Sequence, residues 1–171
     1  MLNRARTIRL AVLFLVLACT AGCDQATKRL ARRELSESRS TSVVGGMVEF
    51  TLAENPGAFL SLGGSLPRQV RSVLTLAIGI GLMALLVFLL SASRLSMLAF
   101  LALSLAWAGG MSNLIDRVGR HGFVTDFIVV RAGPLHTGVF NVADLAIVIG
   151  IIVLFASSLR TDRRFKSPGA A

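Results

Sequence analysis

The sequence predicts a membrane α-helical fold with four transmembrane helices and a small extracytoplasmic β-sheet and loop. The chain of 171 residues is 54% hydrophobic and only 16% charged, whereas a soluble domain has about 25% charged residues. Three segments are also apolar over 21 residues each, at 70–90, 95–115 and 139–159. A helix of that length spans about 31 Å, which matches a hydrocarbon core of about 30 Å. Helices in soluble cores rarely stay apolar on all sides for so long.

The first helix has the weakest signal, because the stretch LACTAGCDQATKRL at 17–30 allows two interpretations. Basic residues, a short apolar run and small residues form the layout of a secretory signal, and TAGC resembles the lipobox of a lipoprotein precursor. A secreted lipoprotein, however, would continue as a polar chain, and this chain has three further apolar segments. Asp24 and Lys28 are four residues apart and can pair on one helix face. We therefore expect a retained first helix, with Cys19 and Cys23 in lipid as apolar side chains.

The whole chain, 1–171, is expected to form a single integral membrane domain. Lys and Arg concentrate in cytoplasmic loops, but here eight fall on one side of the membrane and ten on the other. The basic first segment, with Arg4, Arg6 and Arg9, favours a cytoplasmic N-terminus and, with four spans, two cytoplasmic termini. The net charge of +9 indicates contact with anionic phospholipid headgroups, and no nucleic-acid-binding module is recognised. Helices are expected at about 9–30, 70–91, 95–115 and 139–159, with extracytoplasmic sheet and loop regions at 31–69 and 116–138.

Both extracytoplasmic regions carry signs of β-structure. In the first, Val48, Phe50 and Leu52 alternate with Glu49, Thr51 and Ala53, and this period of two predicts a strand. The dipeptide GG and the tripeptide NPG predict turns. In the second region, HGFVTDFIVV is again typical of a strand and RAGPLHTG of a loop. We therefore expect a small sheet on one side of the membrane.

Two N-x-x-D sequences place amide and carboxyl groups at the ends of neighbouring spans. NLID at 113–116 ends the third span, and NVAD at 141–144 begins the fourth. On a helix, each Asn shares a face with the Asp three residues further on. A carboxylate within a span costs about 2.5–3.5 kcal/mol on insertion scales. The presence of Asp144, and to a lesser extent Asp116, therefore indicates a function.

Five short blocks follow one another along the chain: DQATK (24–28), NPGAF (55–59), GGMSNLIDR (109–117), VTDF (124–127) and FNVAD (140–144). In this order they resemble the signature blocks of the bacterial lipoprotein signal peptidases, also called signal peptidase II. The resemblance implies four membrane helices in the bacterial inner membrane, both termini in the cytoplasm, and a small periplasmic sheet. It implies an aspartic endopeptidase that removes the signal peptide from diacylglyceryl-modified prolipoproteins by cutting before the lipidated cysteine. It also implies no metal, no cofactor, and inhibition by globomycin-like cyclic peptides.

The resemblance also assigns roles to individual residues. Asp126 and Asp144 match the catalytic pair, and Asp24 and Lys28 match a structural motif at the end of the first helix. The chain departs from the family in NPGAF, where Asn-Thr-Gly-Ala-Ala-Phe is common, which leaves the shape of the substrate-facing loop open. It also has Ser112 where Gly is usual, which we expect to alter helix packing only slightly. The residues that match substrate-binding or supporting positions are Asn55, Gly57, Asn113, Asp116, Arg117 and Asn141.

Amide hydrolysis by two carboxylates requires one ionised group, to take a proton from water, and one protonated group, to polarise the scissile carbonyl. Two carboxylates in one site do not both ionise cheaply, so the pair holds one proton near neutrality. The sequence is compatible with two alternative catalytic pairs. Asp126 with Asp144 is the favoured pair, and Asp116 with Asp144 is the alternative. If it is not catalytic, Asp116 is expected to support the site.

Other functions fit the sequence less well. A serine–lysine signal peptidase needs a lysine near the membrane, and the candidate, Lys28, already has Asp24 beside it. A zinc protease needs a ligand cluster such as H-E-x-x-H, which is absent. A small proton-coupled transporter or channel subunit would use buried aspartates as proton relays at the midplane, whereas here the polar residues gather at one end of two spans. An inactive decoy for globomycin-like inhibitors would not require intact aspartates. The sequence does not distinguish a housekeeping enzyme from an antibiotic-resistant paralogue.

Overall fold

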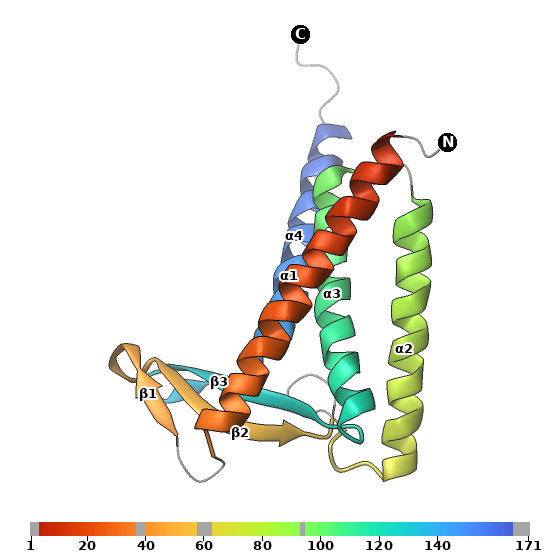
Figure 1. Ribbon diagram of the computed structural model, residues 1–171. Coiled ribbons are helices and arrows are strands. Elements are labelled where there is room, and N and C mark those ends of the chain that lie inside the picture. The colour runs from red at the N-terminus through yellow and green to blue at the C-terminus, as the bar shows by residue number, and fades with distance from the viewer. Residues whose placement is uncertain (1–3, 37–39, 58–62, 93–94, 166–171) are drawn as a thin grey trace.

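Four long helices form the body of the computed structural model (Figure 1), which describes residues 4–36, 40–57, 63–92 and 95–165. Each helix is long and apolar enough to cross a membrane. The first turn of α1 and the last turn of α4 lie at one end of the bundle, and a small sheet lies at the other. The predicted fold class is therefore confirmed. The helices are α1 (Arg4–Glu34), α2 (Arg68–Ser91), α3 (Met97–Gly119) and α4 (Val142–Phe165).

The helix ends differ from the predicted ones for local reasons. α1 extends beyond 9–30, and basic side chains occupy its last turn, where they stabilise the negative end of the helix dipole. α3 continues to Gly119 rather than 115, because hydropathy marks the apolar part of a span and not the end of its hydrogen-bonded helix. Asp116 and Arg117 therefore lie on α3 and not in the loop region 116–138. α4 begins at Val142 rather than 139, while the start of α2 differs by only two residues.

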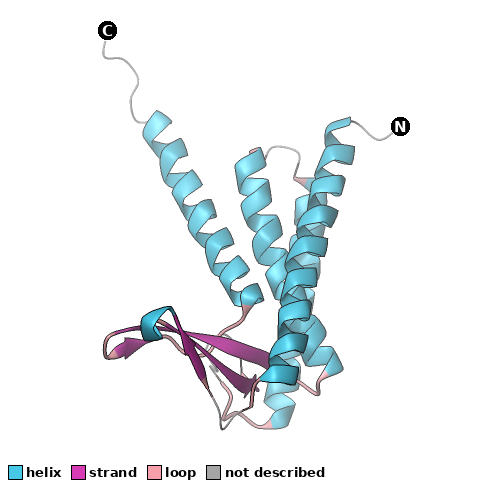
Figure 2. Ribbon diagram, turned by 60° about the vertical axis from the view of Figure 1, so that its left-hand side comes forward, coloured by secondary structure: helices cyan, strands magenta, loops and turns pink. Residues whose placement is uncertain are grey.

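The two regions between the spans that were predicted to be extracytoplasmic combine into one antiparallel sheet of four strands (Figure 2). The central pair is β2 with β3, and in its register Ala53 lies opposite Asp126 and Asn55 opposite Val124. The predicted alternation in 48–53 does form a strand, but its residues are all half-buried and the register shifts between Phe50 and Ala53. The strands are β1 (Thr41–Val43), β2 (Val48–Asn55), β3 (Val124–Ala132) and β4 (Leu135–His136), in that order across the sheet.

α3 is the central helix and packs against each of the other three. Its contact with α4 depends on two glycines: a Cβ atom at Gly109 would lie 2.5 Å from the Ala143 carbonyl oxygen, and one at Gly150 would lie 2.5 Å from that of Ala102. Small residues let membrane helices approach this closely. Trp107 is buried in the core, and its indole Nε1 donates to the Leu82 carbonyl oxygen at 3.0 Å. The close packing of α3 on α4 brings their polar ends together.

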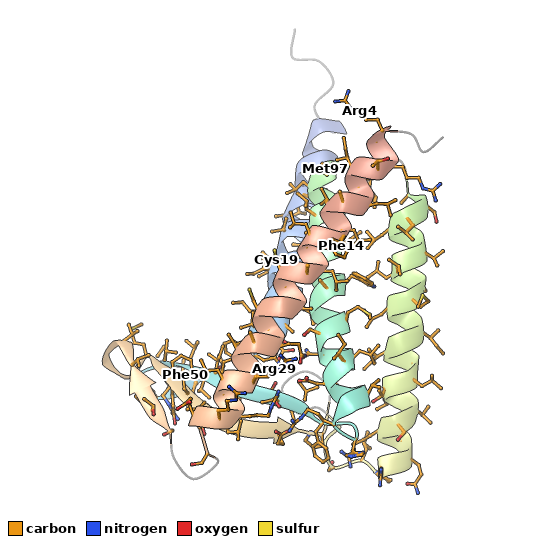
Figure 3. All side chains as sticks on the ribbon, viewed as in Figure 1. Arg4, Phe14, Cys19, Arg29, Phe50 and Met97 are labelled. Atoms are coloured by element: carbon orange, nitrogen blue, oxygen red, sulfur yellow. The ribbon has the colours of Figure 1, made fainter. Side chains whose placement is uncertain are left out.

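The outer surface of the bundle is largely apolar, as expected for helices surrounded by lipid. Figure 3 shows side chains such as Phe14 and Cys19 on α1, between Arg4 at one end and Arg29 near the sheet. Phe14 is 73% exposed, and both cysteines are free and exposed. Cys19 and Cys23 thus lie on the outward surface of a continuous α1, as a retained first helix requires.

Candidate active site

The buried polar residues gather where the lower parts of α1, α3 and α4 in Figure 1 meet strands β2 and β3. Burying polar and charged groups is costly unless they bond to one another, so the contacts of this cluster define the site. Every residue assigned a site role from the sequence lies in this cluster or on its rim. Its buried members are Asp24, Lys28, Asn55, Ser112, Asn113, Asp116, Thr125, Asp126, Asn141 and Asp144.

The start of α4 is a reciprocal cap between Asn141 and Asp144. The Asn141 Oδ1 accepts from the Asp144 backbone N–H at 2.9 Å, and Asp144 Oδ2 accepts from the Asn141 backbone N–H at 3.3 Å. This is the arrangement of a capping box, which satisfies two N–H groups at a helix start. Contrary to our expectation, the NVAD sequence therefore does not place both residues on one helix face. Asn141 precedes the helix and fixes the carboxylate of Asp144.

Asp126 lies on β3 with both carboxylate oxygens bonded to amide groups. Asn55, at the end of β2, donates to Asp126 Oδ2 at 2.8 Å, and Asn141 donates to Asp126 Oδ1 at 2.6 Å. The side chain of Asp126 is almost fully buried. Its two oxygens are thus held by partners from two different elements, and neither partner is a cation.

Asn141 and Asn113 connect the two aspartates. Asn141 bonds to Asp126 through its Nδ2 and to the Asp144 backbone through its Oδ1. Asn113, on α3, donates its Nδ2 to Asp144 Oδ1 at 2.9 Å, and its Oδ1 accepts from Asn141 at 3.2 Å. The two N-x-x-D sequences therefore do meet at one depth. Together they place the carboxyl groups of Asp126 and Asp144 in one hydrogen-bonded network.

The surroundings of Asp126 favour its protonated form. Burial is the main cause that raises the pKa of this carboxyl to about 6, and the charge of Asp144 adds a smaller increase, while hydrogen bonds from Asn55 and Asn141 lower the pKa. Loss of hydration and a nearby like charge both disfavour an ionised carboxyl. A carboxyl with this pKa exchanges its proton close to neutral pH, which is the property required of a catalytic acid or base.

A second buried cluster, centred on Lys28, adjoins the network of Asp126 and Asp144 through Asn113. The ammonium group is 2.7 Å from Asp24 Oδ2 and 3.0 Å from Asp116 Oδ2, and all three side chains are buried. Lys28 also donates to Asn113 Oδ1 at 2.8 Å, which turns the amide N–H₂ of Asn113 toward Asp144. Asp24 Oδ1 accepts from the Ala143 N–H at 2.9 Å. The Asp24–Lys28 pair thus joins the end of α1 to α3 and to the start of α4.

Two members of this cluster were not assigned their full roles from the sequence. Gln25 had no assigned role, and Ser112 was expected to affect only helix packing. The Ser112 hydroxyl donates to Asp24 Oδ2 at 2.7 Å, so its replacement of glycine adds a hydrogen bond as well as altering the packing. Gln25 donates to Asp116 Oδ1 at 3.0 Å and to Ser112 Oγ at 3.2 Å. Gln25 follows Asp24 in the DQATK block, but a single Gln on a predicted membrane helix forms no periodic pattern or motif spacing that would indicate its partners. Its role emerges only when α1 is packed against α3.

Asp116 has a full set of partners. Besides Lys28 and Gln25, its Oδ2 accepts from the Thr125 backbone N–H at 3.3 Å. These bonds hold β3 against α3 one residue before Asp126. The geometry therefore gives Asp116 a supporting position beside the two-aspartate network.

Arg117 and Gly57 form the rim of the site. Arg117 Nη2 donates to the Gly57 carbonyl oxygen at 2.6 Å, and Nη1 donates to that of Asn113 at 3.3 Å. Asn55 Oδ1 accepts from the Gly57 N–H at 2.9 Å, which closes the turn predicted at NPG. The remainder of the substrate-facing loop, at 58–62, lies outside the described residues. Within the described part of the chain, no group of three metal-ligating side chains is found.

The structure combines a multi-pass membrane fold with a buried pair of linked aspartates at one end of its spans, an arrangement compatible with an endopeptidase of the aspartic type. Comparisons with known proteins then identify the family. The family model described as "Signal peptidase (SPase) II" matches residues 15–160, and this chain belongs to that family. A lipoprotein signal peptidase of Geobacter sulfurreducens is 37% identical, with 85% of this chain and 89% of that one covered. One of Syntrophus aciditrophicus is 32% identical, with coverage of 89% and 95%.

A solved structure supports the same conclusion. A bacterial membrane enzyme determined by the in meso method at 2.3 Å resolution superposes with a TM-score of 0.78 and 26% sequence identity, covering 94% of this chain and 95% of that chain. Both the helices and the sheet therefore have a counterpart in a solved membrane enzyme.

Proposed function

We propose that this protein removes the signal peptide from diacylglyceryl-modified prolipoproteins by cutting before the lipidated cysteine, with Asp126 and Asp144 as the catalytic pair. The observation that carries the proposal is the network in which Asn141 bonds to both aspartates, one on strand β3 and one at the first turn of α4. The relatives named above are lipoprotein signal peptidases, which supports the choice of substrate.

Asp126 is a better partner for Asp144 than Asp116 is. The carboxylate oxygens of Asp116 are already engaged by Lys28, Gln25 and the Thr125 backbone N–H. Among the described residues, Asp126 is bonded by the amide groups of Asn55 and Asn141, and its pKa is raised to about 6. That pKa suits a group that gives or takes a proton close to neutral pH.

The mechanism follows from one proton shared by the pair. The ionised carboxylate takes a proton from water as the water oxygen bonds to the scissile carbonyl carbon. The protonated carboxyl donates a hydrogen bond to the carbonyl oxygen, where negative charge develops. Transfer of a proton to the amide nitrogen then allows the C–N bond to break, releasing the signal peptide with a new carboxyl end and the lipidated cysteine with a free amine.

The substrate and the membrane impose an orientation. We place the protein in the bacterial inner membrane with both termini in the cytoplasm, supported by Arg4, Arg6 and Arg9 at the end of α1 remote from the sheet and by the positive-inside tendency. The aspartates then lie near the extracytoplasmic surface, and the apolar outer surface of the helices contacts membrane phospholipid. A globomycin-like cyclic peptide is expected to inhibit by occupying the site between Asp126 and Asp144.

The test is cleavage of a precursor by the purified protein in neutral detergent. Two precursors are compared, one carrying a diacylglyceryl group on the cysteine and one unmodified, and product masses locate the cut. The proposal predicts a cut immediately before the lipidated cysteine and none in the unmodified precursor. Cleavage of both precursors at similar rates, or a cut at another bond, would contradict the assigned specificity.

A further inference from the structure

A stripe of polar residues occupies the first two turns of α2, an otherwise apolar membrane span. Arg68, Arg71, Ser72 and Thr75 are spaced i, i+3, i+4 and i+7, so they lie on one face of the helix. After Thr75, every side chain up to the last residue of α2 is apolar or glycine. The stripe extends about 10 Å along the axis, at about 1.5 Å per residue. Polar side chains facing lipid tails are unfavourable, so the stripe indicates a polar contact at this depth.

The stripe faces a hollow between the start of α2 and the end of α3, which we call the α2–α3 basic cavity. Its volume is about 220 Å³. A second hollow of about 370 Å³ shares Arg68, Arg71 and His121 with it and includes Phe123. The side chains that define the α2–α3 basic cavity are Arg68, Arg71, Ser72, Thr75, Arg117 and His121.

Two arginines of this cavity have no ion-pair partner among the described residues. Neither Arg68 nor Arg71 takes part in an ion pair there. Arg71 Nη1 donates to the Pro56 carbonyl oxygen at 3.4 Å, and its guanidinium lies 5.6 Å from the ring centre of Phe123. The Nε of Arg71 is buried with no hydrogen-bond partner in the described structure.

The position of these arginines on α2 adds to their mutual repulsion. The first turn of α2 has no acidic residue, so Arg68 and Arg71 lie at the positive end of the helix dipole, where cations are unfavourable. An anion in the cavity would remove this repulsion and would give the buried Nε a partner. The cavity is therefore complementary to an anion at the membrane surface.

We propose that the α2–α3 basic cavity binds the phosphate group of a membrane phospholipid. Phosphate oxygens match the paired N–H donors of arginine. The Ser72 and Thr75 hydroxyls donate to backbone carbonyls of α2, and each can rotate to donate to a phosphate oxygen in exchange for that bond. This inference goes beyond the cleavage reaction and does not depend on which aspartates perform it.

The apolar neighbours of the cavity favour a phospholipid over free phosphate. Leu74 and Ile78 line an adjoining hollow along α2 and are 45% and 37% exposed. A headgroup held by Arg68 and Arg71 would place its acyl chains along these side chains, at the depth of the hydrocarbon core. Inorganic phosphate offers the same oxygens but no group for this apolar surface.

The cavity also borders the segment that contacts the catalytic network. Arg71 bonds to Pro56, and Arg117 bonds to Gly57, while Asn55 in the same turn bonds to Asp126. A bound phosphate would hold both arginines in place and thereby fix this turn. We therefore expect phospholipid to increase kcat/KM for cleavage in neutral detergent.

Native mass spectrometry of the full-length protein in neutral detergent tests the proposal directly. The probes are dioleoyl phosphatidylglycerol, dioleoylglycerol with the same chains but no phosphate, and inorganic phosphate. We expect saturable binding of the phospholipid and binding of the other two at least tenfold weaker. Arg68→Gln should weaken phospholipid binding about tenfold, because one hydrogen bond to a charged group is removed. Thr75→Val, a nearly isosteric change, should weaken it about twofold to tenfold, because the Thr75 hydroxyl exchanges a backbone hydrogen bond for one to the phosphate.

Arg29→Gln is the matched control. Arg29 is an exposed arginine at the sheet end of α1 (Figure 3), outside the cavity, so the variant removes the same charge from the same side of the membrane. We expect its phospholipid binding to stay within twofold of the parent. Equal losses for Arg29→Gln and Arg68→Gln, or no loss for both cavity variants when folded, would overturn the proposal. Inorganic phosphate binding as tightly as the phospholipid would overturn it as well, in favour of a site for the free ion.

Discussion

Replacing Lys28 by methionine should destabilise the protein strongly. The ammonium group contacts Asp24 at 2.7 Å, Asp116 at 3.0 Å and Asn113 at 2.8 Å, with no solvent exposure of the side chain. Lys28→Met preserves the length of the side chain but leaves two carboxylates without their buried cation. Removing one partner of a buried ion pair costs about 3–5 kcal/mol.

A second argument gives a similar figure. The protein can relieve the unpaired charge by protonating one carboxyl, which costs about 1.36 kcal/mol for each pH unit above an ordinary pKa of about 3.9. This cost is about 4 kcal/mol at pH 7 and about 1.5 kcal/mol at pH 5. The folded variant then holds one proton more than its unfolded chain, so its stability deficit must shrink as the pH falls.

The measurement is thermal unfolding of the parent and the variant in one neutral detergent at pH 7 and pH 5. A loss of about 4 kcal/mol corresponds to a decrease in Tm of roughly 8–16 °C for a chain of this size, and the decrease should be less than half as large at pH 5. The triple variant Lys28→Met, Asp24→Asn, Asp116→Asn should recover part of the loss, and Arg29→Gln serves as the exposed control. A decrease below 3 °C at pH 7, or one that does not depend on pH, would refute the reasoning.

Three further predictions concern the site. Asn141→Ala removes the cap of α4 and one hydrogen bond to Asp126. The variant should lower the free energy of unfolding by about 1 kcal/mol and should lower kcat/KM by at least tenfold. A cleavage rate equal to that of the parent would contradict the bridging role of Asn141. The dependence of kcat/KM on pH should be bell-shaped with one limb near pH 6, where Asp126 titrates. Because the hydrogen bond from Asn55 lowers the pKa of Asp126, Asn55→Ala should move that limb to higher pH, and a shift to lower pH would be inconsistent with it. Cleavage should continue in EDTA, and loss of activity restored by a divalent ion would exclude the metal-free mechanism.

Much of the fold could be predicted because bilayer thickness imposes a length on apolar segments, and three spans showed that length in full. The first span was harder, since its apolar run is short and resembles a cleaved signal. What distinguishes it is Asp24, which is buried against Lys28 and bonded to Ala143 of α4. The Asp24–Lys28 pair is predicted by its spacing, but the bond to Ala143 depends on how α1 packs against α4, which no local pattern in 17–30 encodes.

The site residues also fall into those that the local sequence indicated and those that required the family resemblance or the packed structure. The energetic cost of an intramembrane carboxylate drew attention to Asp144, and the N-x-x-D sequences indicated that Asn113 and Asn141 lie near it. Nothing local required Asp126, which is on a strand outside the spans and was assigned by family resemblance. The reciprocal cap at Asn141 could have been recognised, because an Asn three residues before an Asp at a helix start is a capping pattern. The contacts of Gln25 and Ser112 required the packed structure.

The most direct test of the central claim compares four variants for accumulation of uncut lipidated precursor, with the folded yield of each measured alongside. Asp126→Asn and Asp144→Asn should each abolish cleavage while folded yield holds or rises, because an amide cannot share the proton and a carboxyl that is costly to bury is removed. The double variant should be no worse than either single one, since the two groups act as a unit. Asp116→Asn should retain residual activity or lower the folded yield. If Asp126→Asn still cuts at a near-normal rate while Asp116→Asn is folded and inactive, the catalytic pair is Asp116 with Asp144 and the assignment to Asp126 is wrong.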